Sequence, residues 1–177
     1  RMPHIPFKIC GDGPLRGWCV EFIKRYGLTN IELLPWLTRR EVQRLIRKAR
    51  IFFFPTLCLE LGIVMCEAML LRTPVVAARQ GVSESVIRHG ENGFLFDPEN
   101  ISELTALIDE IWMRPDLLER VARQARTQVR PYNDADTYVR GLHAICLRLL
   151  ADARTAAPDA RTNLFRPQGG SGQKFQV

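Results

Sequence analysis

The chain alternates short apolar runs with longer amphipathic stretches, and this alternation limits its fold more than any other feature. The apolar runs have the length of strands and lie at Phe7–Cys10, Asn30–Leu34, Ile51–Phe54, Pro74–Ala78 and Gly93–Phe96. Strands that alternate with helices in strict order form a parallel sheet with right-handed crossovers. We therefore predict an α/β fold in which helices sandwich a parallel sheet.

The stretches between these runs carry helix signals. The first has apolar side chains at helical spacing, and we expect Trp18 in this stripe to lie in the core, together with Leu15, Phe22 and Tyr26. Two later helices begin with side chains that cap exposed backbone donors, Thr38 with Glu41 and Asn100 with Glu103. Further helices are expected at Gly62–Leu71, at Ser83–Arg88, and from Asn100 to about Asp152 with breaks at Pro115 and Pro131.

The pattern places one domain at residues 1–152 and a flexible tail at residues 153–177. At 177 residues the chain is long enough for one full core. The tail contains Pro158, Pro167 and the run Gly169–Gly172, with few apolar residues, which is typical of a segment that does not fold alone. The chain begins with Arg1, without an initiator Met or a signal-peptide pattern, so we interpret it as a piece of a longer protein.

Composition excludes some classes of function. No apolar run approaches the length of about 20 residues that a membrane span needs, so no transmembrane segment is expected. The cysteines are odd in number and form no CxxC pair, which favours reduced thiols in a cytoplasmic protein: Cys10, Cys19, Cys58, Cys66 and Cys146. No spacing of residues indicates a metal site.

The net charge of +6 has two interpretations. Much of it lies on one predicted helix, at Arg39, Arg40, Arg44, Arg47, Lys48 and Arg50. Such a cluster can attract nucleic acid or an anionic membrane surface. No aromatic residues are interleaved with it, so we favour a solvated helix face and expect no nucleic-acid partner. Peripheral membrane contact remains an open alternative.

The strongest candidate site follows the strand Ile51–Phe54. In open parallel sheets, ligands bind beyond the carboxyl ends of the strands. A helix that starts at Gly62 would present the unpaired amides of Ile63 and Val64, which can hold phosphates. Glu67, about one and a half turns further on, can accept hydrogen bonds from ribose hydroxyls. Spacing alone is equally compatible with a Glu67 that has no ligand and is only a solvent-exposed side chain near the start of an ordinary helix.

Several short motifs together resemble one enzyme family. These are Gly11-Asp12-Gly13-Pro14-Leu15, Glu67-Ala68-Met69, Thr73-Pro74-Val75-Val76, Gly81-Val82-Ser83-Glu84 and Asn92-Gly93-Phe94-Leu95. The chain from about residue 7 to 150 resembles the C-terminal, donor-binding domain of retaining GT-B type glycosyltransferases, the glycosyl transferases group 1 family. The resemblance implies a Rossmann-like domain that binds a nucleoside diphosphate sugar without a metal or other cofactor.

The resemblance also implies roles for individual residues. Glu67 would bind the donor's ribose, while Gly62 and Ile63 would lie at the phosphate-contacting helix start. Gly11 and Gly13 fall in the family's G-x-G-P-L element, and Leu37 falls in the loop that borders the nucleobase. The family's first strand, its basic pair for the leaving diphosphate and its acceptor-binding N-terminal domain have no counterpart in this sequence.

The sequence departs from the family pattern at several positions. The family has two glutamates separated by seven residues; here an ungapped alignment puts Leu59 at the first position, and a shifted alignment puts Glu60 there. Glu60 is therefore the candidate catalytic residue only in the second alignment. Arg72 stands where the family usually has glycine, and we expect it to face solvent and to be tolerated. Gln80 also replaces a glycine.

The resemblance implies that the chain is part of a hexosyltransferase that works with retention of configuration, and we expect the isolated chain to be inactive. Two alternatives stay open. One is a non-catalytic binding module that kept the fold, and the other is half of a nucleotide-sugar epimerase.

Overall fold

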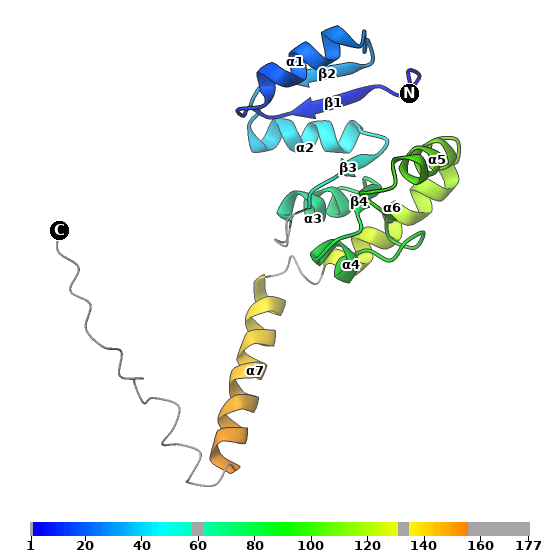
Figure 1. Ribbon diagram of the computed structural model, residues 1–177. Helices are drawn as coiled ribbons and strands as arrows, with labels where there is room; N and C mark the ends of the chain where they lie inside the picture. Colours follow the sequence, from blue (N-terminus) through cyan, green and yellow to red (C-terminus); the bar gives the residue numbers. More distant parts are fainter. Residues whose placement is uncertain (1, 58–61, 131–134, 156–177) are drawn as a thin grey trace, which may run out of the picture. The chain divides into compact units, whose positions relative to one another are not determined.

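The computed structural model describes residues 2–57, 62–130 and 135–155, which form two units, residues 1–131 and 132–177. The first unit contains β1 (Phe7–Cys10), α1 (Arg16–Arg25), β2 (Ile31–Leu34), α2 (Arg39–Lys48), β3 (Phe52–Phe54), α3 (Ile63–Leu70), β4 (Val75–Ala78), α4 (Val82–Val86), β5 (Phe94–Phe96), α5 (Ile101–Trp112) and α6 (Pro115–Val129) (Figure 1). The second unit contains α7 (Ala135–Thr155). The strands lie within about a residue of the predicted runs. The domain boundary expected at residue 152 stays a prediction, and the expected tail beyond Thr155 lies outside the described residues.

All strand pairs of the first unit are parallel. β1 pairs with β2, with Phe7 opposite Ile31, and a second sheet has the order β3-β4-β5, with Val76 opposite Phe94. The predicted α/β class with parallel strands is therefore confirmed. Within the described residues, β1 and β3 each pair along one edge only.

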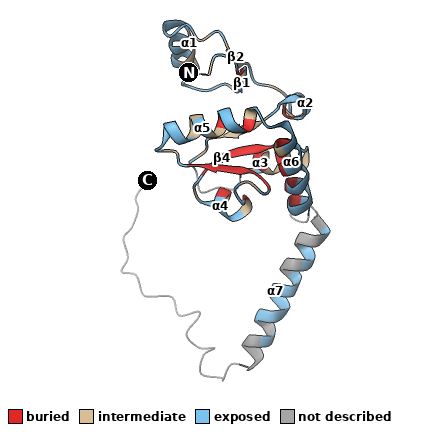
Figure 2. Cartoon of the chain, turned by 90° about the vertical axis from the view of Figure 1, so that its right-hand side faces the viewer, coloured by how far each residue is buried: buried red, intermediate tan, exposed pale blue. Residues whose placement is uncertain are grey.

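β4 lies at the centre of the core. All four of its residues are buried (Figure 2). Successive side chains of a strand point to opposite faces of the sheet. Val75 and Ala77 pack in a cluster with α3 and the end of α6, whereas Val76 and Ala78 pack with α5 and the start of α6. A strand covered on both faces must be apolar throughout, which explains its sequence.

The two predicted caps are present. The Thr38 side chain accepts a hydrogen bond from the Glu41 amide, and the Glu41 carboxylate accepts one from the Thr38 amide at 2.8 Å. The Thr38 hydroxyl also donates to the Glu41 carboxylate at 2.7 Å. This bond first, and then the one from the Thr38 amide, hold the pKa of the Glu41 carboxyl below its ordinary value. Asn100 likewise accepts a hydrogen bond from the Glu103 amide at 3.0 Å. Local signals therefore placed both helix starts correctly.

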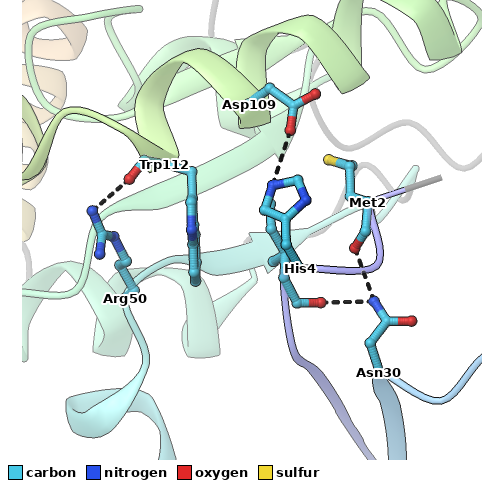
Figure 3. Close-up of polar contacts among 7 residues, drawn as sticks. Met2, His4, Asn30, Arg50, Asp109 and Trp112 are labelled. Atoms are coloured by element: carbon cyan, nitrogen blue, oxygen red, sulfur yellow. Dashed lines mark hydrogen bonds and ion pairs between the residues drawn. The ribbon is translucent and has the colours of Figure 1, made fainter.

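The segment before β1 is held by polar contacts (Figure 3). The Asn30 side-chain amide donates to the carbonyls of Met2 at 3.0 Å and Ile5 at 2.7 Å. His4 Nε2 lies 3.5 Å from a carboxylate oxygen of Asp109 on α5. The entry to β1 is thereby linked both to β2 and to α5.

The prediction that Trp18 lies in the core is wrong. Its side chain is 60% exposed, and α1 has no buried residue. Trp18 stacks on Phe22 with ring centroids 4.9 Å apart, and Phe22 lies 4.6 Å from Tyr26. Helical spacing identified this stripe, but nothing in the described residues covers it.

Arg72 is exposed as expected, but its backbone is unusual. Its φ is 61°, the left-handed conformation, and it is the only non-glycine residue of the described chain with positive φ. Its amide donates to Met69 O, and the next amide, of Thr73, donates to Ala68 O. This pair of bonds is a Schellman motif, in which the left-handed position is usually glycine.

We predict that Arg72→Gly stabilises the fold, whereas the sequence alone led us to expect little change or a slight loss of stability. Left-handed backbone costs an L-residue about 1–2 kcal/mol, and the greater freedom of glycine in the unfolded chain offsets part of that gain. The net increase in the free energy of unfolding should be about 1 kcal/mol, measured by urea denaturation. Arg44→Gly, in the middle of α2, is the control and should lower stability. A loss of stability in Arg72→Gly would contradict the strain argument.

Candidate functional site

The candidate site lies at the carboxyl edge of the parallel strands. Residues 11–14 follow β1, residues 35–38 follow β2, and residues 55–57 follow β3. Loops that leave parallel strands in the same direction meet at one edge of the sheet. Residues 58–61 lie outside the described residues, so the assignment of Glu60 as a catalytic residue, and the alternative of Leu59, stay untested.

The first turn of α3 presents free backbone donors. Met65 and Cys66 both donate to the carbonyl of Gly62, but among the described residues the amides of Ile63 and Val64 have no acceptor. Ile63 is 69% exposed. Free amides and the positive end of the helix dipole make this turn suitable for an anion such as a diphosphate.

Gly62 has a structural role that sequence reasoning did not foresee. A Cβ at this position would lie 2.2 Å from the Phe54 ring, far inside van der Waals contact. The glycine therefore leaves room for the Phe54 ring against the start of α3. Its backbone conformation is ordinary, so space rather than an unusual φ requires glycine here.

Glu67 makes an ion pair that the sequence did not suggest. Its Oε1 accepts hydrogen bonds from Arg39 Nε at 3.0 Å and from a terminal nitrogen of the same guanidinium at 2.5 Å. The Glu67 side chain is 17% exposed and that of Arg39 is 77% exposed. Both bonds converge on one oxygen, so Oε2 has no partner among the described residues and can accept a further donor. The carboxylate is thus held at the edge of the site with one oxygen available.

The loops after β1 and β2 are joined by Arg16. A single terminal nitrogen of Arg16 donates to Gly11 O at 3.2 Å and to Leu34 O at 3.1 Å. Gly11 has a φ of 143°, which an L-residue rarely adopts. Leu37 is half-buried, and no atom lies within 4 Å of a Cβ built on Gly13, so that position faces open space.

Sequence reasoning missed Arg39 and Arg16 as site residues. Arg39 was assigned to the basic helix face, whereas its contact with Glu67 joins the start of α2 to the middle of α3. The position of Arg39 directly after the N-cap Thr38 was the available signal, since it puts the guanidinium at the carboxyl edge of the sheet.

Other groups near the site give no sign of metal or thiol chemistry within the described residues. In residues 2–57, 62–130 and 135–155, no three side chains of His, Cys, Asp or Glu come together as a metal site would require. Burial raises the pKa of the Cys66 thiol, which keeps it protonated.

Among the described residues, no helix combines the length and apolar character needed to cross a bilayer.

Known proteins share this fold and sequence pattern. The chain is 26% identical over 130 residues to the 2-deoxystreptamine N-acetyl-D-glucosaminyltransferase of Niallia circulans, an alignment that covers 73% of this chain and 33% of that protein. It is 28% identical over 120 residues to the alpha-D-kanosaminyltransferase of Streptomyces kanamyceticus, covering 67% and 31%. The chain therefore spans about a third of the length of these relatives.

Solved structures agree with the fold. The crystal structure of Anabaena HepE in complex with UDP matches with a TM-score of 0.72 and 25% identity, covering 82% of this chain and 42% of that one. Sucrose-phosphate synthase of Thermosynechococcus elongatus matches with a TM-score of 0.72 at 20% identity, covering 85% and 41%, and shows the fold alone.

The sequence profile of the family described as glycosyl transferases group 1 matches residues 1–128. Because this match covers well over half of the chain, the protein belongs to the glycosyl transferases group 1 family.

Proposed function

We propose that this chain is the donor-binding, C-terminal domain of a retaining glycosyltransferase that uses a nucleoside diphosphate sugar. The observation that carries the proposal is the pairing of a free helix start with a held carboxylate. The amides of Ile63 and Val64 have no acceptor among the described residues, and Glu67 Oε2 on the same helix is open. A ligand with phosphates and a ribose a few ångströms apart fits this spacing.

Each group has a distinct task in this proposal. The amides at the start of α3 bind the diphosphate and stabilise the charge that grows on it as the glycosidic bond breaks. Glu67 accepts hydrogen bonds from ribose hydroxyls, which fixes the nucleotide and orients the sugar. Arg39 holds the Glu67 carboxylate in place. The HepE structure contains UDP, which supports a uridine or related nucleotide as the first ligand to test.

We further propose that a strand outside the described residues completes the sheet. Doubly wound sheets with six strands have the order 3-2-1-4-5-6. If the strand outside the described residues comes first in the sheet's numbering, β1 to β5 are its second to sixth strands. The pairs β2-β1 and β3-β4-β5 then fit this order, and the added strand would lie between β1 and β3. Ligands in such sheets bind at that central crevice, which borders the end of β3. The missing strand and the acceptor-binding domain would therefore form the other wall of the donor site.

We predict that Glu67→Gln weakens binding of nucleoside diphosphates by about 1.5–3 kcal/mol, the cost of a lost hydrogen bond to a charged group. Isothermal titration with UDP, GDP and ADP measures the loss. With a 2′,3′-dideoxy nucleotide the wild type and Glu67→Gln should bind equally, because the hydroxyls that Glu67 serves are absent. Glu91→Gln, an exposed glutamate that lies 3.9 Å from Arg88, is the control and should bind like the wild type.

Arg39→Gln tests whether the ion pair matters for binding. If Arg39 acts through Glu67, its loss should weaken binding of ribonucleotides but not of dideoxy nucleotides, and it should have no further effect in the Glu67→Gln background. Equal affinity of wild type and a folded Glu67→Gln for every ribonucleotide would refute the proposed ribose contact. An effect of Arg39→Gln that does not depend on the ribose hydroxyls would separate Arg39 from that role.

We predict that the chain alone neither transfers nor hydrolyses a sugar, because in this proposal the other wall of the site, which would exclude water from the donor, belongs to a domain outside this sequence. Release of nucleoside diphosphate from UDP-, GDP- and ADP-sugars is the measurement. Cooperative thermal unfolding of the same sample shows that the chain is folded. Turnover by the purified chain would contradict the proposal and would place the catalytic groups within these 177 residues.

A further inference from the structure

Four arginines gather at the edge of the sheet opposite the candidate donor site. Arg72 lies in the turn that enters β4, and Arg123, Arg126 and Arg130 are spaced three, four and seven residues apart on one face of α6 and its C-cap. With Thr127 they line a cavity of about 350 Å³. Because Arg72 precedes its strand whereas Gly62 follows one, this cavity and the start of α3 lie at opposite ends of the parallel strands.

The charge of this cavity is not neutralised. No carboxylate of a described residue lines it. Arg123 lies 3.7 Å from Glu119, but both side chains are more than 60% exposed, and such pairs are weak. Arg72, Arg126 and Arg130 form no ion pair with any described residue. Like charges held together repel one another, so the arrangement favours an anion in their midst.

Arg72 adds a second argument. It occupies a left-handed position where glycine would be relaxed, yet its side chain makes no hydrogen bond within the described residues. When no contact of the side chain within the fold compensates for a strained backbone, the strain points to a function of that side chain. The side chain lines the arginine cavity, so contact with a ligand there would account for the arginine.

A second, more apolar cavity adjoins the first. It has a volume of about 310 Å³, shares Arg72 and Arg123 with the arginine cavity, and is also lined by Pro74, Leu118 and Ala122. Arg50, at its margin, is already engaged: its guanidinium lies 4.7 Å from the Trp112 ring centre and donates to the Trp112 carbonyl (Figure 3). Of the two shared arginines, Arg72 forms no ion pair with a described residue, and Arg123 has the weak, exposed pair with Glu119, which also lines this second cavity.

We propose that Arg72, Arg123, Arg126 and Arg130 form a binding site for a phosphate-bearing anion, separate from the donor site. Guanidinium groups bind phosphate oxygens through two parallel hydrogen bonds, and several of them around one cavity suit a group with more than one negative charge. The same chemistry is offered by free polyphosphate and by the headgroup of an anionic lipid, whose apolar part the neighbouring cavity could receive.

The test measures binding of tripolyphosphate by isothermal titration, and binding to vesicles of phosphatidylcholine with or without phosphatidylglycerol by co-sedimentation. The double variant Arg126→Gln/Arg130→Gln should weaken binding at least tenfold. Arg120→Gln, an exposed arginine on the same helix that lines neither cavity, should change it less than twofold. Tripolyphosphate binding lost in the double variant identifies a soluble anion, and loss of phosphatidylglycerol-dependent sedimentation identifies a lipid headgroup. Either result supports the site.

Arg72→Gly provides a readout that a structural role cannot mimic. It should raise thermal stability and at the same time weaken anion binding, because the substitution relaxes the backbone but removes a guanidinium. The proposal is overturned if neither ligand binds, if binding survives the double variant, or if Arg120→Gln weakens it equally. None of these results bears on nucleotide binding at Glu67, which the dideoxy comparison measures separately.

Discussion

Burial of β4 on both faces is the constraint on which the rest of the first unit depends. Its alternate side chains enter two clusters, one under α3 and the end of α6, the other under α5 and the start of α6. These packed layers hold β4 together with the two strands that it joins, β3 and β5, all parallel to one another. Once that direction is set, every helix start that follows a strand lies at one edge of the sheet and every helix end that precedes one lies at the other. The start of α3 and the turn at Arg72 take their opposite positions from this geometry.

Most of the architecture could be predicted from local patterns, because strand length, helix spacing and capping side chains act over a few residues. Thr38 and Asn100 marked helix starts correctly, and β4 was recognised as a continuous apolar run. Trp18 shows where such reasoning stops: spacing identifies an apolar stripe, but its burial depends on what else packs against it. The strained backbone of Arg72 could have been predicted from the sequence, because the related family usually has glycine at this position and the position follows the end of a helix.

The candidate site was harder to predict because its contacts join distant parts of the chain. The sequence suggested no protein partner for Glu67, whereas Arg39 binds its carboxylate from another helix. Gly62 was assigned to ligand approach, but the Phe54 ring already requires it. The basic charge was attributed to α2, although the arginines that share a cavity come from α6 and the turn before β4. Charge counted along a sequence does not show which guanidinium groups meet in space.

The central claim is that the start of α3 binds the diphosphate of a nucleotide while Glu67 binds its ribose. Amide chemical shifts of the ¹⁵N-labelled chain, followed during titration with UDP, GDP and ADP, test it most directly. The account predicts that the amides of Ile63 and Val64 shift more than those of other residues, and that the nucleoside without phosphates leaves them nearly unchanged. If a nucleotide binds while the chemical shifts of these two amides do not change, the diphosphate lies elsewhere and the account is contradicted.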